Sequence, residues 1–335
     1  DKQIKDIIQN LIETEIDIIE VGYLNKGKGK EKHSTIFRSI EEAEKAIPTS
    51  GKQCDFVIML NLDDFTPNCI SPREARKISG IRLAFHKNGI KKALEVGRLI
   101  TELGYNLFVQ PMVTVAYTDQ ELLSLIEEFN RLQPYAFYIV DSFGSIDKET
   151  FKRLLYLVDN NLAKQVKLGF HSHNNMQLAY SNSIDMLKMV GKRESIIDSS
   201  TFGMGRGAGN LNSEILASYL NKEYDKNYKI DYLLEVIDNH LEAIYRTNYW
   251  GFSLAQFLSA SMNCHPNYAS YLINRKTLTV KAIKQILFSL PPEKAVSYDI
   301  KLIERIYTDF LSSNQLPEDC DIRIFASREI LLVGS

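Results

Sequence analysis

The segment KLGFHSHNN, residues 167–175, decides the fold. It begins as a short buried strand and ends in two histidines, His171 and His173, separated by one residue. Side chains alternate between the two faces of a strand, so both imidazoles point to the same side at its C-terminal end. Because neutral imidazole is a common metal ligand, the pair predicts a divalent metal site. The alternative is that the histidines are hydrogen-bonded residues of the core or its rim.

The composition is that of an ordinary globular protein, since 44% of the 335 residues are hydrophobic and 24% are charged. The formal net charge is −2 and no basic block stands out, which argues against nucleic acid as a partner. No run of about 18 apolar residues occurs, so we expect no membrane span. The four cysteines, Cys54, Cys69, Cys264 and Cys320, are scattered and form no CxxC pair. They indicate reduced thiols and a cytoplasmic protein.

Apolar runs alternate with helical patterns through the first two thirds of the chain. Seven such runs read as strands, at residues 16–22, 55–60, 80–86, 105–110, 136–141, 167–173 and 195–199. Continuous apolar strands separated by helices predict an α/β fold with a parallel sheet covered on both faces. The architecture that we expect is a TIM (β/α)₈ barrel, with an open doubly wound sheet as the alternative.

A closed barrel of this kind needs an eighth strand. The chain opens directly on a helical pattern, with Ile4, Ile7, Ile8 and Leu11 on one face and no capping residue before them. We therefore expect the first strand to be missing from this chain and to lie upstream of Asp1.

Three regions follow from the change in pattern along the chain. Residues 1–225 form the predicted catalytic barrel, and residues 226–326 a helical C-terminal appendage. Residues 327–335 read as a further buried strand, which we interpret as the start of another, truncated domain.

Chemistry in a TIM barrel gathers at the C-terminal ends of the strands. Polar residues occur at each of these positions: Glu20, Asn61 with Asp63, Arg82 with His86, Gln110, Asp141 with Ser142, His171 with His173, and Asn210 in the last loop. Several have a structural alternative. Asp63, His86 and Gln110 can be rim residues satisfied by water, Glu20 can form an ion pair, and Asp141 can cap the following turn.

The glycine-rich stretch GMGRGAGN, residues 203–210, follows the last predicted strand. As a dinucleotide-binding fingerprint it is weak, because it fits only the permissive form and lies at the wrong strand. A flexible loop that swings the amide oxygen of Asn210 toward the metal suits its position better. Phosphate binding at this corner of the barrel is also open.

Four motifs carry a resemblance to a known family: IEVG at 19–22, DSFG at 141–144, HSHN at 171–174 and GMGRGAGN at 203–210. Together they resemble the metal-dependent lyase and aldolase superfamily of 3-hydroxy-3-methylglutaryl-CoA lyase, over roughly residues 1 to 220. The look is closest to 4-hydroxy-2-oxovalerate aldolase-like members. The resemblance implies a TIM barrel that holds Mg²⁺ or Mn²⁺, with Zn²⁺ also admitted.

The resemblance also implies roles for particular residues. His171, His173 and Asn210 match the metal ligands, and Glu20 matches a glutamate beside the catalytic centre. The family's Arg-Asp pair on the first strand does not occur in this chain. We expect it just upstream of Asp1.

The implied function is that of an aldolase or carbon–carbon lyase acting on a small 2-oxo acid, of the 4-hydroxy-2-oxo kind, through a metal-stabilised enolate. Arg82 can supply a cation, although a salt bridge to Glu20 is its alternative use. His86 and Tyr117 are candidates for the general base. We assign Gln110, Asp141 and Ser142 to substrate binding.

Two other functions remain open at this point. One is an acyl-CoA condensing synthase of the same superfamily, which needs a groove for pantetheine. The other is a barrel that has lost its chemistry and serves as a scaffold, which the absence of the Arg-Asp pair favours. For the enzyme, the resemblance implies a homo-oligomer and admits a dehydrogenase partner that consumes the product.

Overall fold

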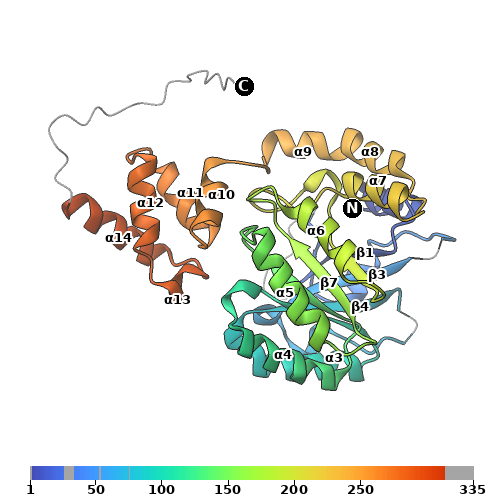
Figure 1. Cartoon of the computed structure of the whole chain (residues 1–335). Coiled ribbons are helices and arrows are strands. Elements are labelled where there is room, and N and C mark those ends of the chain that lie inside the picture. Colours follow the sequence, from blue (N-terminus) through green and yellow to red (C-terminus); the bar gives the residue numbers. More distant parts are fainter. Residues whose placement is uncertain (1, 26–33, 53, 75, 314–335) are drawn as a thin grey trace. The chain divides into compact units, whose positions relative to one another are not determined.

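The computed structural model describes residues 2–25, 34–52, 54–74 and 76–313. The chain divides into two compact units, Asp1–Phe252 and Ser253–Ser335 (Figure 1).

A parallel sheet of eight strands forms the first unit, in the order β2-β1-β3-β4-β5-β6-β7-β8. The strands are β1 (Ile18–Leu24), β2 (Ile36–Phe37), β3 (Asp55–Asn61), β4 (Ile78–Phe85), β5 (Asn106–Pro111), β6 (Ala136–Asp141), β7 (Lys167–Ser172) and β8 (Ser195–Ile197). The seven predicted strands are thus confirmed to within a few residues. The two-residue strand β2 was not predicted; it pairs only with Tyr23 and Leu24 of β1.

Helices connect the strands and pack outside the sheet (Figure 1). Those of the first unit are α1 (Lys2–Glu13), α2 (Ile40–Glu44), α3 (Ile90–Glu102), α4 (Asp119–Leu132), α5 (Lys148–Asn161), α6 (Ala179–Met189), α7 (Ser213–Glu223), α8 (Ile230–Val236) and α9 (Glu242–Thr247). Helix α4 shows how sequence sets a boundary. Thr118 and Glu121 form the reciprocal capping box that satisfies the first free amide groups of the helix.

One apolar layer lies on each face of the sheet. The larger one fills the space between strands and helices and contains residues such as Ile81, Phe137 and Phe151. The smaller one contains Val57, Phe108, Ala136, Tyr138 and Val140, which alternate with the first set along the strands. These are the inward positions of the sheet.

Two glycines make room for this inner layer. A Cβ at Gly169 would lie 2.5 Å from the Tyr138 ring, and one at Gly80 would lie 2.5 Å from the Phe108 ring. Both glycines stand beside these aromatic residues on neighbouring strands, with Tyr138 opposite Gly169 in the β6–β7 register. The large rings therefore fill the interior because their neighbours have no side chain.

The sheet curls on itself, as one inward side chain demonstrates. Arg82 on β4 contacts both Glu20 on β1 and Asp198, which follows β8. In a flat sheet β4 and β8 would lie about 19 Å apart, at about 4.8 Å per strand. The contact therefore requires barrel curvature and excludes the open doubly wound sheet. Among the described residues β2 and β8 do not pair with each other, and the strand expected upstream of Asp1 stays a prediction.

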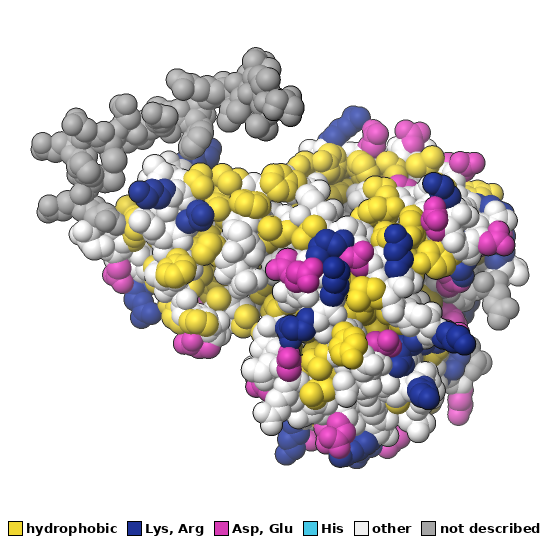
Figure 2. Space-filling view, viewed as in Figure 1, with side chains coloured by type: hydrophobic (Ala, Val, Ile, Leu, Met, Phe, Trp, Pro, Cys, Tyr) yellow, Lys and Arg dark blue, Asp and Glu magenta, His cyan; other side chains and the backbone are white. Residues whose placement is uncertain are grey.

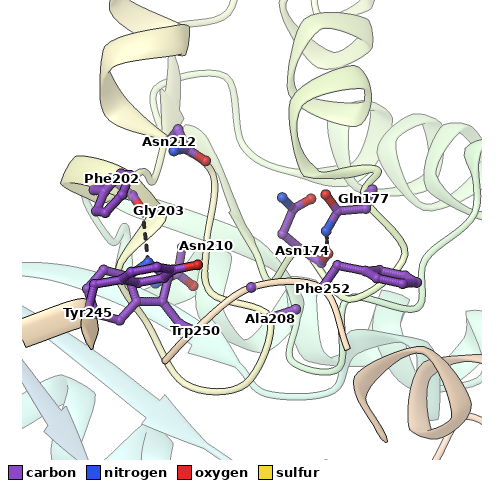
Figure 3. Close-up of a pocket in the computed structure, with 11 residues that line it drawn as sticks. Asn174, Gln177, Phe202, Gly203, Ala208, Asn210, Asn212, Tyr245, Trp250 and Phe252 are labelled. Carbon is purple, nitrogen blue, oxygen red and sulfur yellow. Dashed lines mark hydrogen bonds between the residues drawn. The ribbon is translucent and has the colours of Figure 1, made fainter. Parts of the chain in front are cut away.

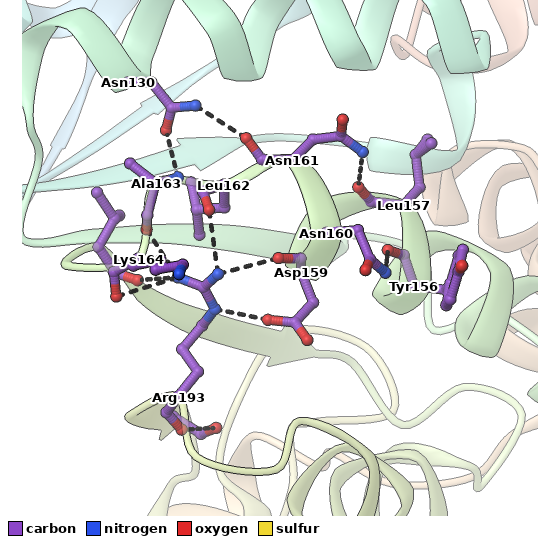
Figure 4. A network of polar contacts seen from close by, with 12 residues as sticks. Asn130, Tyr156, Leu157, Asp159, Asn160, Asn161, Leu162, Ala163, Lys164 and Arg193 are labelled. Carbon is purple, nitrogen blue, oxygen red and sulfur yellow. Dashed lines mark hydrogen bonds and ion pairs between the residues drawn. The ribbon is translucent and has the colours of Figure 1, made fainter.

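Arg193 fastens the connection between α5 and β7 (Figure 4). Its guanidinium donates to the carbonyl oxygens of Leu162, Ala163 and Val166 at 3.0, 2.7 and 2.8 Å, and to Oδ1 of Asp159 at 2.5 Å. The charge thus satisfies carbonyl groups at the C-terminal end of the helix, where a cation is also favoured by the helix dipole.

The first compact unit extends to Phe252, beyond residue 225, where we placed the end of the barrel domain. Helix α8 packs against α1 and α7. The backbone amide of Lys229 donates to the carbonyl of Thr14 at 3.0 Å, and His240 pairs with Asp6 at 2.6 Å. These contacts tie the segment after residue 225 to the N-terminal helix.

The second unit is helical in its described part. It contains α10 (Leu254–Ser261), α11 (Pro266–Asn274), α12 (Val280–Phe288), α13 (Pro292–Ala295) and α14 (Ile300–Ser313). It has its own apolar core, which includes Tyr268, Leu272 and Ile303. The strand predicted at 327–335 lies outside the described residues.

Lys and Arg side chains are interspersed with Asp and Glu over the face shown in Figure 2. No helix within the described ranges is long and apolar enough to cross a membrane.

Candidate active site

Four inward residues, from β1, β4, β7 and the segment after β8, form a charged cluster: Glu20, Arg82, His171 and Asp198. Nη1 of Arg82 donates to Oε2 of Glu20 at 2.5 Å, and Nη2 donates to Oδ2 of Asp198. Nδ1 of His171 lies 2.8 Å from the same Asp198 oxygen. The Glu20–Arg82 salt bridge, predicted as the structural use of this pair, is confirmed. We refer to these four residues as the charged cluster.

The charges of the cluster depend on one another. Burial raises the pKa of Glu20, and the neighbouring Arg82 offsets only part of this effect. For Asp198 burial also acts to raise the pKa, but Arg82 and His171 outweigh it and hold the pKa below its usual value. Burial acts to lower the pKa of Arg82, whereas Asp198 and Glu20 raise it more, so the guanidinium stays charged.

Asp198 determines which nitrogen of His171 is free. A carboxylate accepts hydrogen bonds, so the proton of the imidazole lies on Nδ1, which faces Asp198. The lone pair of Nε2 is then available to a metal ion. A carboxylate that orients a histidine ligand in this way is a common second contact of protein metal sites.

The aromatic ring of Tyr138 and the side-chain amide of Gln110 contact the Arg82 guanidinium. The guanidinium carbon lies 5.4 Å from the centre of the Tyr138 ring. The amide oxygen of Gln110, with the amide oriented toward the guanidinium, accepts from Nε of Arg82 at 2.8 Å. Gln110 is 2% exposed. Its observed contact is therefore with Arg82, and its assignment to substrate binding stays a prediction.

His173 lies between β6 and the loop of residues 203–210, which we call the glycine loop. Its backbone amide donates to the carbonyl of Asp141 at 3.1 Å, and the next amide, of Asn174, donates to the carbonyl of Gly209 at 2.9 Å. A β-bridge joins His173 to Asn210. The rings of His171 and His173 lie 5.4 Å apart between centroids. The structure thus brings all three predicted metal ligands to one place.

His173 and Asn210, two of the three candidate ligands, have the chemical properties that a metal ligand requires. Burial lowers the pKa of His173 to about 3, with smaller contributions from the charges of His171 and Arg206. The ring is therefore neutral at physiological pH and keeps a lone pair. Oδ1 of Asn210 is buried and has no hydrogen-bond partner among the described residues. An unpartnered acceptor on a residue bridged to His173 fits a divalent cation.

Carboxylates do not complete this set within the described part of the chain, where no group of three or more His, Cys, Asp and Glu side chains could hold a metal ion. The fit therefore rests on two imidazoles and an amide oxygen.

Glycines allow Asn210 to reach this position. A Cβ at Gly205 would lie 2.5 Å from Nδ2 of Asn210, and one at Gly209 would lie 2.2 Å from the carbonyl oxygen of Gly203. Gly209 also has a φ of 77°, which side chains other than glycine rarely adopt. Nδ2 of Asn210 donates to the carbonyl of Met204 at 3.1 Å, which fixes the amide orientation.

Asp141 and Ser142 hold the backbone of neighbouring loops. Oδ1 and Oδ2 of Asp141 accept from the amides of Ser145 and Ile146 at 2.9 and 3.2 Å. The turn-capping alternative for Asp141 is thus observed, and burial raises its pKa to about 7. Oγ of Ser142 accepts from the amide of Val113 at 2.9 Å. Their assignment to substrate binding stays a prediction.

The two candidates for the general base lie in other surroundings. Tyr117 is 4% exposed and belongs to the apolar layer between sheet and helices. Burial raises the pKa of its hydroxyl, which would oppose its use as a base. Burial lowers the pKa of His86, with Asp63 opposing the effect. No hydrogen bond described here joins either residue to the charged cluster.

No site role was predicted from the sequence for Asp198 or Arg206. Asp198 follows Ile196 by two residues, so the alternation of β8 already places it on the inward face. Arg206 is exposed and forms no ion pair with any described residue. Its charge lowers the pKa of both His173 and Tyr23, which places a cation near both residues. Arg206 therefore places one exposed positive charge on the glycine loop, near His173 and Tyr23.

A cavity of about 160 Å³ lies beside the glycine loop (Figure 3). Eleven residues line it: Asn174, Gln177, Phe202, Gly203, Ala208, Asn210, Asn212, Tyr245, Trp250, Gly251 and Phe252. Two hydrogen bonds hold the loop against the segment after α9. Nε1 of Trp250 donates to the carbonyl of Phe202 at 2.9 Å, and the amide of Gly251 donates to the carbonyl of Gly207 at 3.1 Å.

The fold and these site motifs define a member of a known enzyme family. The profile of the HMGL-like family matches residues 1–239, and the chain belongs to that family. This confirms the resemblance inferred from the motifs.

Particular relatives agree with this assignment. The 4-hydroxy-2-oxovalerate aldolase of Geobacillus genomosp. 3 is 25% identical over 229 residues, covering 66% of this chain and 64% of the relative. The chain thus spans somewhat less than two thirds of the length of this relative. The aldolase of the same name from Geobacillus stearothermophilus is also 25% identical, over 234 residues, with the same two shares of 66% and 64%.

Solved structures support the fold. The N-terminal domain of a candidate aldolase from Bacteroides vulgatus superimposes with a TM-score of 0.65 at 25% identity, covering 80% of this chain and 89% of that chain. HMG-CoA lyase from Brucella melitensis gives a TM-score of 0.57 at 16% identity, covering 72% and 92%. The predicted TIM-barrel class with a helical C-terminal region is confirmed.

Proposed function

We propose that this protein is a divalent-metal-dependent carbon–carbon lyase of the aldolase type, which cleaves a 4-hydroxy-2-oxo acid through an enolate. One observation carries the proposal. The two histidine rings lie 5.4 Å apart, His173 is bridged to Asn210, whose buried amide oxygen has no partner among the described residues, and Asp198 joins His171 to the buried cation Arg82. The names of the curated relatives point to the same chemistry.

His171, His173 and Asn210 would hold the metal, for which Mg²⁺ and Mn²⁺ suit the mixed nitrogen and oxygen donors and Zn²⁺ is also compatible. When bound, the ion supplies Lewis acidity at the 2-oxo group. Asp198 keeps the His171 imidazole in the tautomer that can bind.

The bond between C3 and C4 of the substrate breaks in the proposed reaction. The hydroxyl group on C4 loses its proton and becomes the carbonyl of the released aldehyde, while the electron pair of the broken bond moves into the enolate. Protonation of C3 then converts the enolate into the other product, a shorter 2-oxo acid. A proton carrier must therefore accept a proton and return one.

Glu20 is suited to carry this proton. Its pKa is raised by burial, which brings a carboxyl group closer to the operating pH. Its side chain is 25% exposed, so a substrate can approach it, and it is held in place by Arg82. We place Glu20 ahead of His86 and Tyr117 because it belongs to the charged cluster.

The positive charge of Arg206 supports an anionic substrate. Glu20 and Asp198 balance Arg82 within the cluster. Arg206 has no such balance among the described residues, so a carboxylate at the mouth of the barrel would gain an ion pair. We assign Arg206 to recognition of the 2-oxo acid carboxylate.

The other functions receive less support. A pantetheine arm needs a long groove, whereas the cavity beside the glycine loop measures about 160 Å³. A scaffold without chemistry does not explain why the histidine pair lies next to Asn210, whose buried amide oxygen has no partner among the described residues. We further propose a cytoplasmic location, since Cys54, Cys69 and Cys264 are free thiols. A homo-oligomer and a dehydrogenase partner that consumes the aldehyde are also part of this proposal.

Exchange of the methyl protons of pyruvate in D₂O tests the proposal without the natural substrate, because enolate formation alone causes exchange. The full chain is loaded with Mn²⁺ or Mg²⁺, and the methyl signal is followed by NMR. We expect metal-dependent exchange that a His171→Ala, His173→Ala double variant loses. His240→Ala, which removes an imidazole paired with Asp6 on α1, is the matched control. Equal bound metal and equal exchange in all three proteins would refute the proposal.

A further inference from the structure

The cavity beside the glycine loop shares Asn210 with the candidate metal centre, and it includes Asn174, the residue that follows His173. A molecule bound through His171 and His173 would therefore have this cavity beside it. Figure 3 shows Phe202, Tyr245 and Trp250 on one side of the cavity and Asn174, Gln177 and Phe252 on the other.

None of the eleven lining residues carries a charged side chain. An ionised group placed in such a cavity loses hydration without gaining a counter-charge, which is costly. The lining therefore selects against a phosphate or a second carboxylate at this position. The charge of the substrate would have its partners elsewhere, at Arg206 and the proposed metal ion.

The amide groups of the lining present both donors and acceptors. Nε2 of Gln177 donates to the carbonyl of Asn174 at 2.5 Å, and Nδ2 of Asn212 donates to Oε1 of Glu214 at 2.7 Å, which leaves both amide oxygens as acceptors. Oδ1 of Asn174 accepts from the amide of Ala179 at 3.3 Å, which leaves its NH₂ group as a donor. A hydroxyl group can donate and accept, so it complements this mixed set better than a methylene group does.

Aromatic rings supply the apolar wall. The rings of Tyr245 and Trp250 lie 4.8 Å apart, and those of Phe202 and Trp250 lie 5.8 Å apart, between centroids. Such rings pack against the C–H faces of a carbon chain, while nearby polar groups fix its orientation. The volume of about 160 Å³ suits a chain of a few carbon atoms.

We propose that this cavity binds the uncharged, hydroxylated tail of the substrate. This inference rests on the proposed aldolase function and specifies its substrate class: 4-hydroxy-2-oxo acids in which C4 bears a short polyhydroxylated chain. The aldehyde released on cleavage is then a small neutral hydroxyaldehyde, rather than an unsubstituted alkyl aldehyde or a sugar phosphate.

Trp250 is the only tryptophan in the chain, so its fluorescence reports on this cavity alone. The full chain is titrated with erythritol, 1-butanol and glycerol 3-phosphate as probes of a hydroxylated, an alkyl and a charged tail. We expect saturable quenching by erythritol, with an affinity about tenfold above that for either other probe, as loss of one or two hydrogen bonds predicts. Equal or weaker binding of erythritol would overturn the proposal.

Gln177 provides a variant that reverses the preference. Gln177→Leu removes an amide from the lining and should weaken erythritol binding by roughly tenfold. Gln177→Lys adds a cation and should raise the affinity for glycerol 3-phosphate by a similar factor. Gln120→Leu, an exposed glutamine at the start of α4, is the matched control and should leave binding unchanged. Unchanged probe affinities in both Gln177 variants would place the tail elsewhere.

The two proposals fail in different ways. Fluorescence quenching needs no turnover, and pyruvate exchange needs no occupant of the cavity. Exchange without selective quenching would refute only the tail site. Selective quenching without exchange would leave a sugar-alcohol site on a protein that lacks the proposed chemistry.

Discussion

Nδ1 of His171 and Oδ2 of Asp198 lie 2.8 Å apart, and the same carboxylate also receives Arg82. One side chain thus orients a candidate metal ligand and balances a buried cation. This double contact links the candidate metal site to the interior of the barrel.

Asp198→Asn tests this link. The amide can present its NH₂ group to His171, so the imidazole is no longer held in the tautomer that leaves Nε2 free. We expect the affinity for Mn²⁺ to fall roughly 10- to 100-fold, as is usual when the partner of a histidine ligand is lost. Isothermal titration calorimetry gives the affinity. Asp119→Asn, an exposed carboxylate paired with Arg153, should bind Mn²⁺ normally. An affinity unaffected by Asp198→Asn would show that Asp198 serves only Arg82.

Arg206→Ala tests recognition of the substrate carboxylate. Loss of this exposed cation should raise the pyruvate concentration at half-maximal exchange about tenfold, with the maximal rate within about threefold, because a charge-assisted contact is lost from binding alone. Arg206→Lys should recover part of the affinity. Arg246→Ala, a mostly exposed arginine on α9, is the control. A change in maximal rate alone would assign Arg206 to the chemical step instead.

Gly169→Ala tests the packing of the barrel interior. The new Cβ would meet the Tyr138 ring at 2.5 Å, so the ring must move and lose its position below Arg82. Overpacking of this kind costs about 1–3 kcal/mol of unfolding free energy. Urea denaturation measures it. In Gly51→Ala the added methyl group meets nothing within 4 Å, so the stability should change little. Equal effects of the two substitutions would contradict the described packing.

The pKa of Asp141 predicts a pH dependence of stability. Burial raises the pKa of this carboxyl from an ordinary 3.8 to about 7 in the folded protein. Between these values the folded chain keeps a proton that the unfolded chain has lost. Its contribution is therefore fully present below pH 3.8 and is lost as the pH rises through about 7.

Asp141→Asn cannot ionise and should remove this contribution. We expect the Tm of the metal-free variant to fall less between pH 5 and pH 8 than the Tm of the parent protein. Differential scanning fluorimetry in the presence of a chelator gives both values. Parallel pH profiles for the two proteins would mean that Asp141 is ionised throughout this range.

Arg193→Ala tests the connection between α5 and β7. The substitution removes the donor of the Leu162 and Val166 carbonyl groups, whereas the Ala163 carbonyl keeps the amide of Val166, and each unsatisfied buried group is costly. We expect a loss of about 3 kcal/mol in unfolding free energy. Arg131→Ala on α4, whose side chain is 62% exposed and pairs with two glutamates, should cost less than about 1 kcal/mol. Similar losses in the two variants would refute the role of Arg193.

The alternation of strands and helices in the first unit could be predicted because each buried strand appears in the sequence as a short run of apolar residues. Strand β2 was missed for the same reason: two residues carry no periodicity, and they pair only through Tyr23 and Leu24. The extension of the first unit to Phe252 could not be predicted from local sequence patterns. It depends on contacts between residues far apart in the sequence, such as that between His240 and Asp6.

Within the site, the histidine pair and Asn210 could be predicted from motif and alternation. The role of Asp198 could not, although alternation along β8 gives its inward position, because this role depends on Arg82 on β4, which reaches Asp198 only through barrel curvature. For Asp141 the sequence left two uses open. The amides of Ser145 and Ile146 account for both of its oxygens.

The hydrogen bond from Trp250 to Phe202 joins residues 48 positions apart and fastens the loop that carries Asn210. Each strand that the structure describes precedes Trp250 in the chain, so a nascent polypeptide can form these strands before Trp250 has been synthesised. Under the proposed metal binding, the site would be complete only after synthesis has passed Trp250, later than the strand that carries His171.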